Sequence, residues 1–301
     1  YLWDINLEMI REIKLVRYNR KYLPEIKIPK NVFPIEEVKE VPAEIKKIIS
    51  AVPCHALRSS LNFLKPLSIG SICIACKGFE PDTQKLNHKV IEEEINNCSI
   101  AVLSGPSFAK EVASGLPTAI TIASKDIKIA QDFSSLFHSD IFRTYVHSDY
   151  IGVQIAGAVK NVMAIAAGIS DGLGFGSNAR SALITRGLAE IIRLGISIGA
   201  KQETFLGLAG LGDLILTCTD NQSRNRRLGL LLAEGLSVKQ AREKINQEIE
   251  GLNTAKEVGA LAKKNKIEMP ITEQVINVIE SKCSAKDAVQ NLLNREQKIE
   301  A

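Results

Sequence analysis

The sequence has little imbalance of charge and few aromatic residues. Its 38 lysines and arginines are interspersed with 34 acidic residues, which leaves a net charge of +4, and only 5% of the residues are aromatic. A nucleic-acid-binding surface usually combines a basic stripe with aromatic side chains on which bases stack. We therefore expect no nucleic acid among the partners.

Cysteines are also few and scattered. The six cysteines show no spacing that indicates a disulfide framework. Cys73 and Cys76 form a CxxC, but SICIAC is typical of a buried strand, and no second pair supplies further zinc ligands. We expect no metal site. The first residues also lack the basic region and apolar core of a signal peptide, which favours a cytoplasmic protein.

The chain is long enough, at 301 residues, for two domains. In residues 1–147, short apolar runs alternate with amphipathic segments, a pattern typical of a parallel sheet covered by helices. The predicted strands are 47–52, 71–75, 100–103, 118–122 and 142–146. Residues 148–301 show only helical patterns. We expect an α/β doubly wound sheet followed by an all-α domain, with ligands at the carboxyl ends of the strands.

Residues 154–171, QIAGAVKNVMAIAAGISD, predict a helix of small apolar residues that contains one lysine. Polar residues interrupt the run and no second such run exists, so a membrane span is not favoured. Lys160 projects from a face suited to burial. Two interpretations stay open: its amine reaches solvent past small neighbours, or it lies in an apolar pocket with a pKa lowered from about 10.4.

Three further segments have two interpretations each. SGPSFAKE at 104–111 predicts a helix start, capped by Ser104 or Ser107, that either binds an anion or is an ordinary turn. In CKGF, Lys77 either reaches the ligand cleft or is solvated. In GLAGLGDLILTCTD, Asp213 is either a helix cap or the partner of a buried lysine.

Residues 219–229, TDNQSRNRRLG, place three arginines in the first turn of a predicted helix. Asn221 or Ser223 would cap this helix. Arg224, Arg226 and Arg227 then lie where the helix dipole disfavours positive charge, and a bound phosphate would relieve the conflict. The alternative is that these side chains extend into solvent or pair with acidic residues elsewhere.

The chain resembles the bacterial-type NAD(P)-dependent glycerol-3-phosphate dehydrogenases through motifs that occur in the same order along essentially the whole sequence. These motifs are CKGFE, SGPSFAKE, GVQIAGAVKNVMAIAAGISDGLGFGSNARSALITRG, GLAGLGDLILTCTDNQSRNRR and EIEG. The resemblance implies reversible hydride transfer between NAD or NADP and the pair dihydroxyacetone phosphate and sn-glycerol 3-phosphate. That reaction feeds phospholipid synthesis.

The resemblance also implies roles for individual residues. Lys160 matches the lysine that transfers the proton. The substrate-binding positions are Lys77, Gly105, Ser107, Asp213, Ser223, Arg224 and Asn225. The cofactor-binding positions are Lys77, Ala109, Arg224, Glu248 and Glu250. The arginine-rich segment argues against related dehydrogenases of non-phosphorylated hydroxy acids.

The sequence departs from the family at its beginning. The family starts with a strand, a GxGxxG turn and a helix that hold the pyrophosphate, and YLWD at residues 1–4 resembles the second strand. We therefore expect a truncated sheet, and keep as an alternative a remnant with little dinucleotide binding or activity. Asp4 favours NAD, but both cofactors stay open. A homodimer also remains open.

Overall fold

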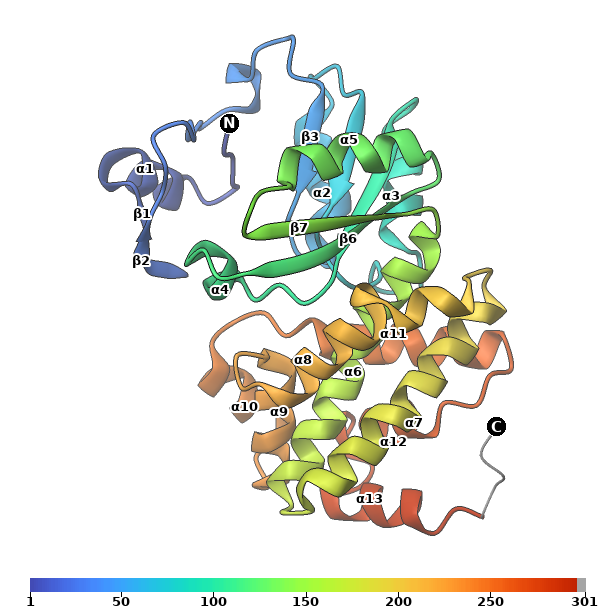
Figure 1. The fold of residues 1–301 in the computed structure, drawn as a ribbon. Coiled ribbons are helices and arrows are strands. Elements are labelled where there is room, and N and C mark those ends of the chain that lie inside the picture. The colour runs from blue at the N-terminus through green and yellow to red at the C-terminus, as the bar shows by residue number, and fades with distance from the viewer. Residues whose placement is uncertain (297–301) are drawn as a thin grey trace.

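The computed structural model describes residues 1–296 and has two parts (Figure 1). We call residues 1–147 the sheet region and residues 148–296 the helical region. The last strand, β7, ends at His147, and the first long helix, α6, begins at Tyr150. Residues 297–301 of the expected all-α stretch lie outside the described part of the chain.

The main sheet has five strands in the order β3-β4-β5-β6-β7. Strands β3, β4 and β5 run parallel, β6 is antiparallel to β5, and β7 is parallel to β6. The strands are β3 (Lys47–Ser50), β4 (Ser71–Ile74), β5 (Ser99–Ser104), β6 (Thr118–Ser124) and β7 (Phe142–His147). Each predicted strand end lies within two residues of the observed one. The expected α/β fold is confirmed.

Helices cover both faces of this sheet. On one face lie α2 (Cys54–Leu64) and α3 (Asn87–Glu94), and their apolar side chains join Ile72 and Ile74 of β4 in one buried cluster. On the other face lies α5 (Ile127–Phe137), which packs with Cys73 of the same strand. The alternation along β4 follows from the two-residue repeat of a strand. The short helix α4 (Ala109–Ala113) follows β5.

The N-terminal segment lies beside the sheet without joining it. It contains α1 (Leu7–Val16), the hairpin β1 (Tyr18–Asn19) and β2 (Leu23–Lys27), and the short helix η1 (Val38–Glu40). The expectation that YLWD forms a strand of the main sheet is wrong. Leu2 makes only an isolated bridge to Pro34, because its backbone N–H and C=O bond to Phe33 and Ile35.

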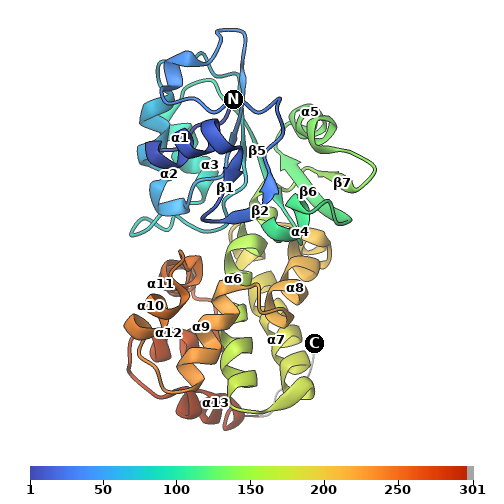
Figure 2. The same cartoon turned by 90° about the vertical axis from the view of Figure 1, so that its left-hand side faces the viewer.

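The helical region is organised around α6 (Tyr150–Gly172), which runs from the junction through its middle (Figures 1 and 2). The other elements are α7 (Gly176–Ser197), η2 (Gln202–Leu206), the π-helical turn η3 (Leu208–Gly212), α8 (Asp213–Thr219), α9 (Arg224–Ala233), α10 (Val238–Ile245), α11 (Glu250–Lys264), α12 (Pro270–Ile279) and α13 (Ala285–Leu293).

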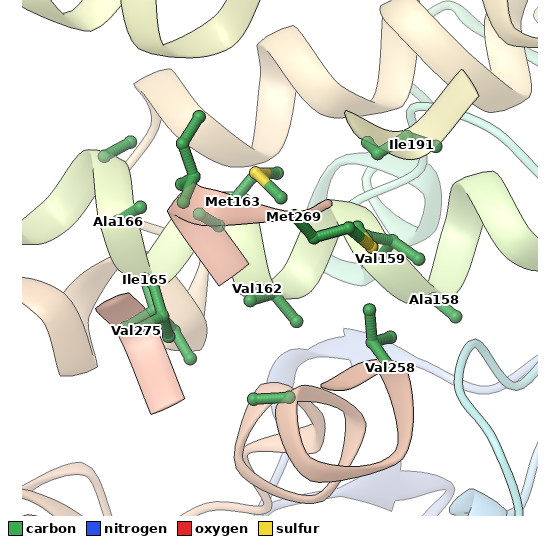
Figure 3. Packing of buried hydrophobic residues seen from close by; sticks show 14 of the residues in the cluster. Ala158, Val159, Val162, Met163, Ile165, Ala166, Ile191, Val258, Met269 and Val275 are labelled. Carbon is green, nitrogen blue, oxygen red and sulfur yellow. The ribbon is translucent and has the colours of Figure 1, made fainter. Parts of the chain in front are cut away.

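Helix α6 has the length and apolar composition of a membrane span, yet 94% of its most apolar stretch is buried within the protein. Figure 3 shows Val159, Val162 and Met163 of α6 packed among side chains of other helices. The apolar run is therefore accounted for by burial in the core of the helical region.

Two glycines allow α6 and α9 to cross in direct backbone contact. A Cβ added at Gly168 would lie 2.1 Å from the Arg226 carbonyl oxygen and 2.9 Å from the Gly229 Cα. A Cβ added at Gly229 would lie 2.1 Å from the Ile165 carbonyl oxygen. Only glycine fits at either position, because backbone atoms cannot give way as a flexible side chain can.

We expect Gly168→Ala to destabilise the protein by about 1–3 kcal/mol or more, since the added methyl group must force the two helices apart. Urea denaturation measures this loss. Gly207→Ala is the control, because its Cβ would make an ordinary 3.5 Å contact with the Thr204 carbonyl oxygen. Equal stability of the two variants would contradict the proposed crossing contact.

Candidate functional site

The candidate site lies where the carboxyl ends of β3, β4 and β5 face the helical region. These strands are parallel, so the segments that follow them meet at one edge of the sheet. Cys54, Lys77 and Gly105 lie in these segments, a few residues beyond each strand. Residues of α6, α8, α9 and α11 face these three segments from the helical region.

The centre of the site is a carboxylate held between two ammonium groups. The Lys160 Nζ donates a hydrogen bond to Asp213 Oδ1 at 2.5 Å, and the Lys77 Nζ donates to Asp213 Oδ2 at 2.7 Å. Lys77 also donates to the Gly105 carbonyl oxygen at 2.9 Å. The structure thus brings Lys77 and Gly105 of the sheet region together with Lys160 and Asp213 of the helical region.

Burial changes the proton affinity of this cluster. The Lys160 and Asp213 residues are only 7% and 1% exposed. Burial, reinforced by the nearby Lys77 charge, lowers the pKa of Lys160 to about 8, although Asp213 opposes the shift. Burial tends to raise the pKa of Asp213, but the two ammonium groups outweigh it and hold that pKa below its usual range. Asp213 is thus ionised at neutral pH, while Lys160 can gain or lose a proton.

Thr217 is a member of this cluster that the sequence reasoning missed. Its hydroxyl accepts a hydrogen bond from Lys160 Nζ at 2.8 Å and donates one to the Asp213 carbonyl oxygen at 2.6 Å. The two acceptors, Thr217 and Asp213, fix the direction of the Lys160 amine. Their spacing of four residues in α8 places both side chains on one face of the helix, which is the signal that could have identified Thr217.

Small residues let the two regions approach closely enough to enclose these charges. A Cβ added at Gly157 of α6 would lie 2.7 Å from the Ser104 Oγ and 3.4 Å from the Lys77 Cγ. Gly105 has a φ of 142°, and a Cβ there would lie 3.0 Å from the Ile120 Cα. Both glycines are therefore required by contact or by backbone conformation.

The turn after β5 is not the capped helix start that the sequence predicted. Helix α4 begins at Ala109 after Phe108, and neither Ser104 nor Ser107 caps it. The Ser107 hydroxyl instead donates to the Gly105 carbonyl oxygen at 3.0 Å. The Ser104 Oγ is buried and has no hydrogen-bond partner among residues 1–296. Because the five-residue helix begins beyond the turn, Ser107 makes a local bond in place of a cap and Ser104 does not cap the helix.

The start of α9 separates the three arginines. Ser223 caps the helix by accepting a hydrogen bond from the Arg226 N–H. Arg226 is buried and forms an ion pair with Asp171 at 2.5 Å, and Arg227 donates to Gln247 at 3.4 Å. The expectation that all three arginines call for a bound anion is therefore wrong for Arg226, whose charge is balanced by a carboxylate on α6.

Arg224 is exposed at the same helix start. Its neighbour Asn225 is only 8% exposed, donates to Asn161 Oδ1 at 2.9 Å and accepts from the Gly251 N–H at 2.9 Å. Because Asn161 directly follows Lys160, this pair ties the beginning of α9 to the part of α6 that carries the buried lysine. The amide of Asn225 also ties it to the beginning of α11.

Comparisons with known proteins agree with this arrangement. The N-terminal and C-terminal parts of the NAD-dependent glycerol-3-phosphate dehydrogenase family match residues 1–130 and 149–290. The chain belongs to this family. It is 48% identical to glycerol-3-phosphate dehydrogenase [NAD(P)+] of Bartonella henselae over 303 aligned residues, which cover 99% of this chain and 89% of that protein.

Two further members of the glycerol-3-phosphate dehydrogenase family are similarly close to this chain. The Pseudoalteromonas translucida enzyme is 49% identical, with 99% of this chain and 90% of that protein covered. The crystal structure of the Coxiella burnetii glycerol-3-phosphate dehydrogenase superposes with a TM-score of 0.93 at 44% identity, covering 98% of this chain and 91% of that chain. The similarity supports an NAD(P)-dependent oxidoreductase and not the alternative of a remnant without the family's function.

Two of the expected cofactor positions, Glu248 and Glu250, lie beside the start of α2. This helix has no side-chain cap, and the Cys54 N–H donates to Glu250 Oε1 at 3.4 Å. Burial and the Glu248 carboxylate raise the pKa of Glu250, and Glu248 Oε1 lies 3.9 Å from His55 Nδ1. The start of α2 lies at the carboxyl edge of the sheet, where a doubly wound fold places the anionic part of a dinucleotide, and the Glu250 carboxylate accepts its first N–H.

Ala109, another expected cofactor contact, is exposed at the first residue of α4. Glu111 on that helix accepts a hydrogen bond from Gln222 Nε2 at 2.7 Å. Gln222 lies just before the start of α9, so this contact joins the segment after β5 to the segment that carries Arg224. The expected cofactor and substrate positions thus border one another across the junction.

We expect Asp213→Asn to destabilise the protein by about 3–5 kcal/mol at pH 7, because it leaves two partly or fully buried ammonium groups without their carboxylate. The loss should shrink at pH 9.5, where Lys160 is neutral. Urea denaturation at the two pH values measures it. Asp220→Asn is the control, since Asp220 accepts only an exposed bond from the Gln222 N–H. A loss as small as that of the control would contradict the central role of Asp213.

Proposed function

We propose that this chain interconverts dihydroxyacetone phosphate and sn-glycerol 3-phosphate, with Lys160 as the group that donates and accepts the proton. One observation carries this proposal: a buried lysine with a pKa of about 8 is held by Asp213 and Thr217 in a glycerol-3-phosphate dehydrogenase fold. A proton-transfer group works best when its pKa lies near the working pH.

The chemistry at the reacting carbon follows from this geometry. Bound NAD(H) or NADP(H) supplies or accepts the hydride. During reduction, negative charge grows on the ketone oxygen, where the Lys160 ammonium stabilises it and delivers a proton. During oxidation, the neutral amine of Lys160 removes the alcohol proton. Asp213 and Thr217 keep the amine directed in both cases.

Substrate binding uses both sides of the junction. On the sheet side, Lys77, Gly105 and Ser107 line the approach to Asp213. On the helical side, the start of α9 holds the phosphate through Arg224, with Ser223 and Asn225 beside it. A guanidinium fork matches phosphate oxygens, and the helix start adds to the positive field. This remote contact supplies binding energy that orients the reacting carbon.

The dinucleotide lies along the carboxyl edge of the sheet, contacted by Lys77, Ala109, Arg224, Glu248 and Glu250. The position of the α2 start at this edge, in contact with Glu250, supports this placement. Both NAD and NADP remain in the proposal, because Asp4, which would favour NAD at the end of a sheet strand, lies in a segment outside the main sheet.

The two regions of the chain divide the work of the enzyme between them. Residues 1–147 act as the dinucleotide-binding domain and residues 148–301 as the substrate domain, supported by the change from strands to helices after His147. The enzyme is cytoplasmic and feeds glycerophospholipid synthesis. A homodimer is supported by an open apolar groove of about 740 Å³ between α7, α12 and α13, where Phe175 and Leu293 are exposed.

We expect Lys160→Ala to lower kcat by about 10²–10⁴-fold, because the proton must then come from water. In the unmodified enzyme, oxidation of glycerol 3-phosphate should rise as the pH passes about 8, where the Lys160 amine becomes neutral, and reduction of dihydroxyacetone phosphate should fall. The variant should lose this break. Steady-state kinetics from pH 6 to 10 measures both effects. Near-normal turnover of the variant would refute the role of Lys160.

We expect Arg224→Ala to raise the KM for dihydroxyacetone phosphate by about 10–100-fold with a smaller change in kcat, because a charge-assisted bond to the phosphate is lost. Arg227→Ala is the matched control from the same helix turn, since Arg227 reaches Gln247 instead. Initial rates over a range of substrate concentrations give both constants. Equal turnover of a non-phosphorylated hydroxy acid would contradict the phosphate site.

A further inference from the structure

The segment between β4 and α3 crosses from the sheet region into the core of the helical region. Phe79 and Leu86, at the two ends of this loop, are 2% and 9% exposed and belong to the buried cluster built on α6. The two residues form an isolated antiparallel bridge, and the Glu80 N–H donates to the Lys85 carbonyl oxygen at 2.9 Å. We call residues 79–86 the crossing loop.

The tip of the crossing loop is held by a carboxylate of α11. Glu257 is 5% exposed, and its Oε1 accepts a hydrogen bond from the Asp82 N–H at 2.8 Å. Its Oε2 accepts from the Gln84 N–H at 3.2 Å and from Gln84 Nε2 at 3.1 Å. A buried carboxylate is stabilised when several donors surround it, so these three bonds explain an acidic residue in this position.

The bonds to Glu257 also hold an uncommon backbone conformation. Asp82 and Gln84 have φ values of 65° and 55°, in the left-handed region that side chains other than glycine rarely adopt. Such a conformation persists only where surrounding contacts impose it. Glu257 supplies those contacts, because it accepts the N–H group of each of the two residues.

The crossing loop begins two residues after Lys77. Two residues span at most about 7 Å, so the anchored Phe79 limits how far the Lys77 backbone can lie from the crossing loop. Lys77 reaches Asp213 through a single side chain. Glu250, two helical turns before Glu257 on α11, meanwhile accepts the Cys54 N–H, so α11 holds the segments after both β3 and β4.

We propose that Glu257 is a positioning residue for the reaction, which fixes the crossing loop on α11 and thereby keeps the Lys77 ammonium beside Asp213. Glu257 touches none of the expected substrate positions in its hydrogen bonds, and it acts through the backbone of the loop. This inference rests on the proposed function, because its expected effect is a change in the pKa of Lys160, the proposed proton-transfer group.

The charged and titratable groups that act on Lys160 are Asp213, Lys77 and the Cys218 thiol. Of these, Lys77 lowers the pKa of Lys160, whereas Asp213 and Cys218 raise it. If Lys77 moves away while Asp213 stays, the pKa of Lys160 must rise from about 8 towards the ordinary lysine value of 10.5. Lower stability alone, with Lys160 still buried, does not produce this change.

The test compares the steady-state kinetics of the Glu257→Gln variant with those of the unmodified enzyme from pH 6 to 10. Glutamine keeps the shape but turns one acceptor into a donor that faces backbone N–H groups. We expect kcat to fall by about 10-fold or more, since small displacements of catalytic groups are costly. We also expect the pH break of glycerol 3-phosphate oxidation to move upward. Glu257→Asp, which keeps both acceptors, should restore part of the activity.

Glu190→Gln is the matched control. Glu190 is also a buried glutamate that accepts two backbone N–H groups and a side-chain donor, from Ile271 and Thr272 at the start of α12. It should lose stability without a shift of the pH break. If Glu257→Gln does not fold, Gln84→Ala removes one bond to the same carboxylate and should give a smaller upward shift.

The outcomes separate this inference from the proposed function. The positioning role alone is overturned if the unmodified enzyme shows a break near pH 8 in its pH–rate curve and the folded Glu257→Gln variant shows the same break. If Glu257→Gln does not fold, the same result with Gln84→Ala overturns it. Reduced activity with an unchanged break also overturns it, because a purely structural role then suffices. The absence of any break in the unmodified enzyme refutes the role of Lys160 itself.

Discussion

A buried carboxylate joins the two regions of the protein at the centre of the site. Asp213 binds Lys160 from the long helix of the helical region and Lys77 from the segment after β4. Removing two ammonium groups and a carboxylate from water is costly, and the three charges are tolerable only because they face one another. The same arrangement leaves one negative charge between two positive ones, so a net positive charge remains for an oxygen that becomes negative during reaction.

The sequence was informative where a residue type conflicts with its local pattern. Lys160 is a charged residue on a face of small apolar residues, and that conflict marked it as a candidate while leaving a solvent-reaching and a buried amine both open. The strands and the change to helices followed from hydrophobic periodicity. Asp213 as a partner for the lysine was one of two open interpretations, because nothing local distinguishes a capping aspartate from one that points towards another helix.

Features that depend on distant partners could not be predicted. Arg224 and Arg226 look alike in the sequence, but Asp171, which lies far away in the chain, pairs with only one of them. The same holds for Glu257, whose neighbours on α11 suggest an ordinary amphipathic helix. The serines after β5 were misassigned because the following helix begins later than the proline in SGPSFAKE suggested. In each case tertiary contacts decided between alternatives that are equal locally.

Because of the glycine contact between α6 and α9, a small tilt of α9 about the crossing point is enlarged at the start of the helix. Arg224 lies five residues from Gly229, which corresponds to about 7.5 Å along the helix axis. A tilt of about 10° around the crossing would displace the start of α9 by about 1.3 Å, comparable to the misplacements that impair catalysis. The absence of side chains at Gly168 and Gly229 therefore fixes how accurately the start of α9, which carries Arg224, is placed.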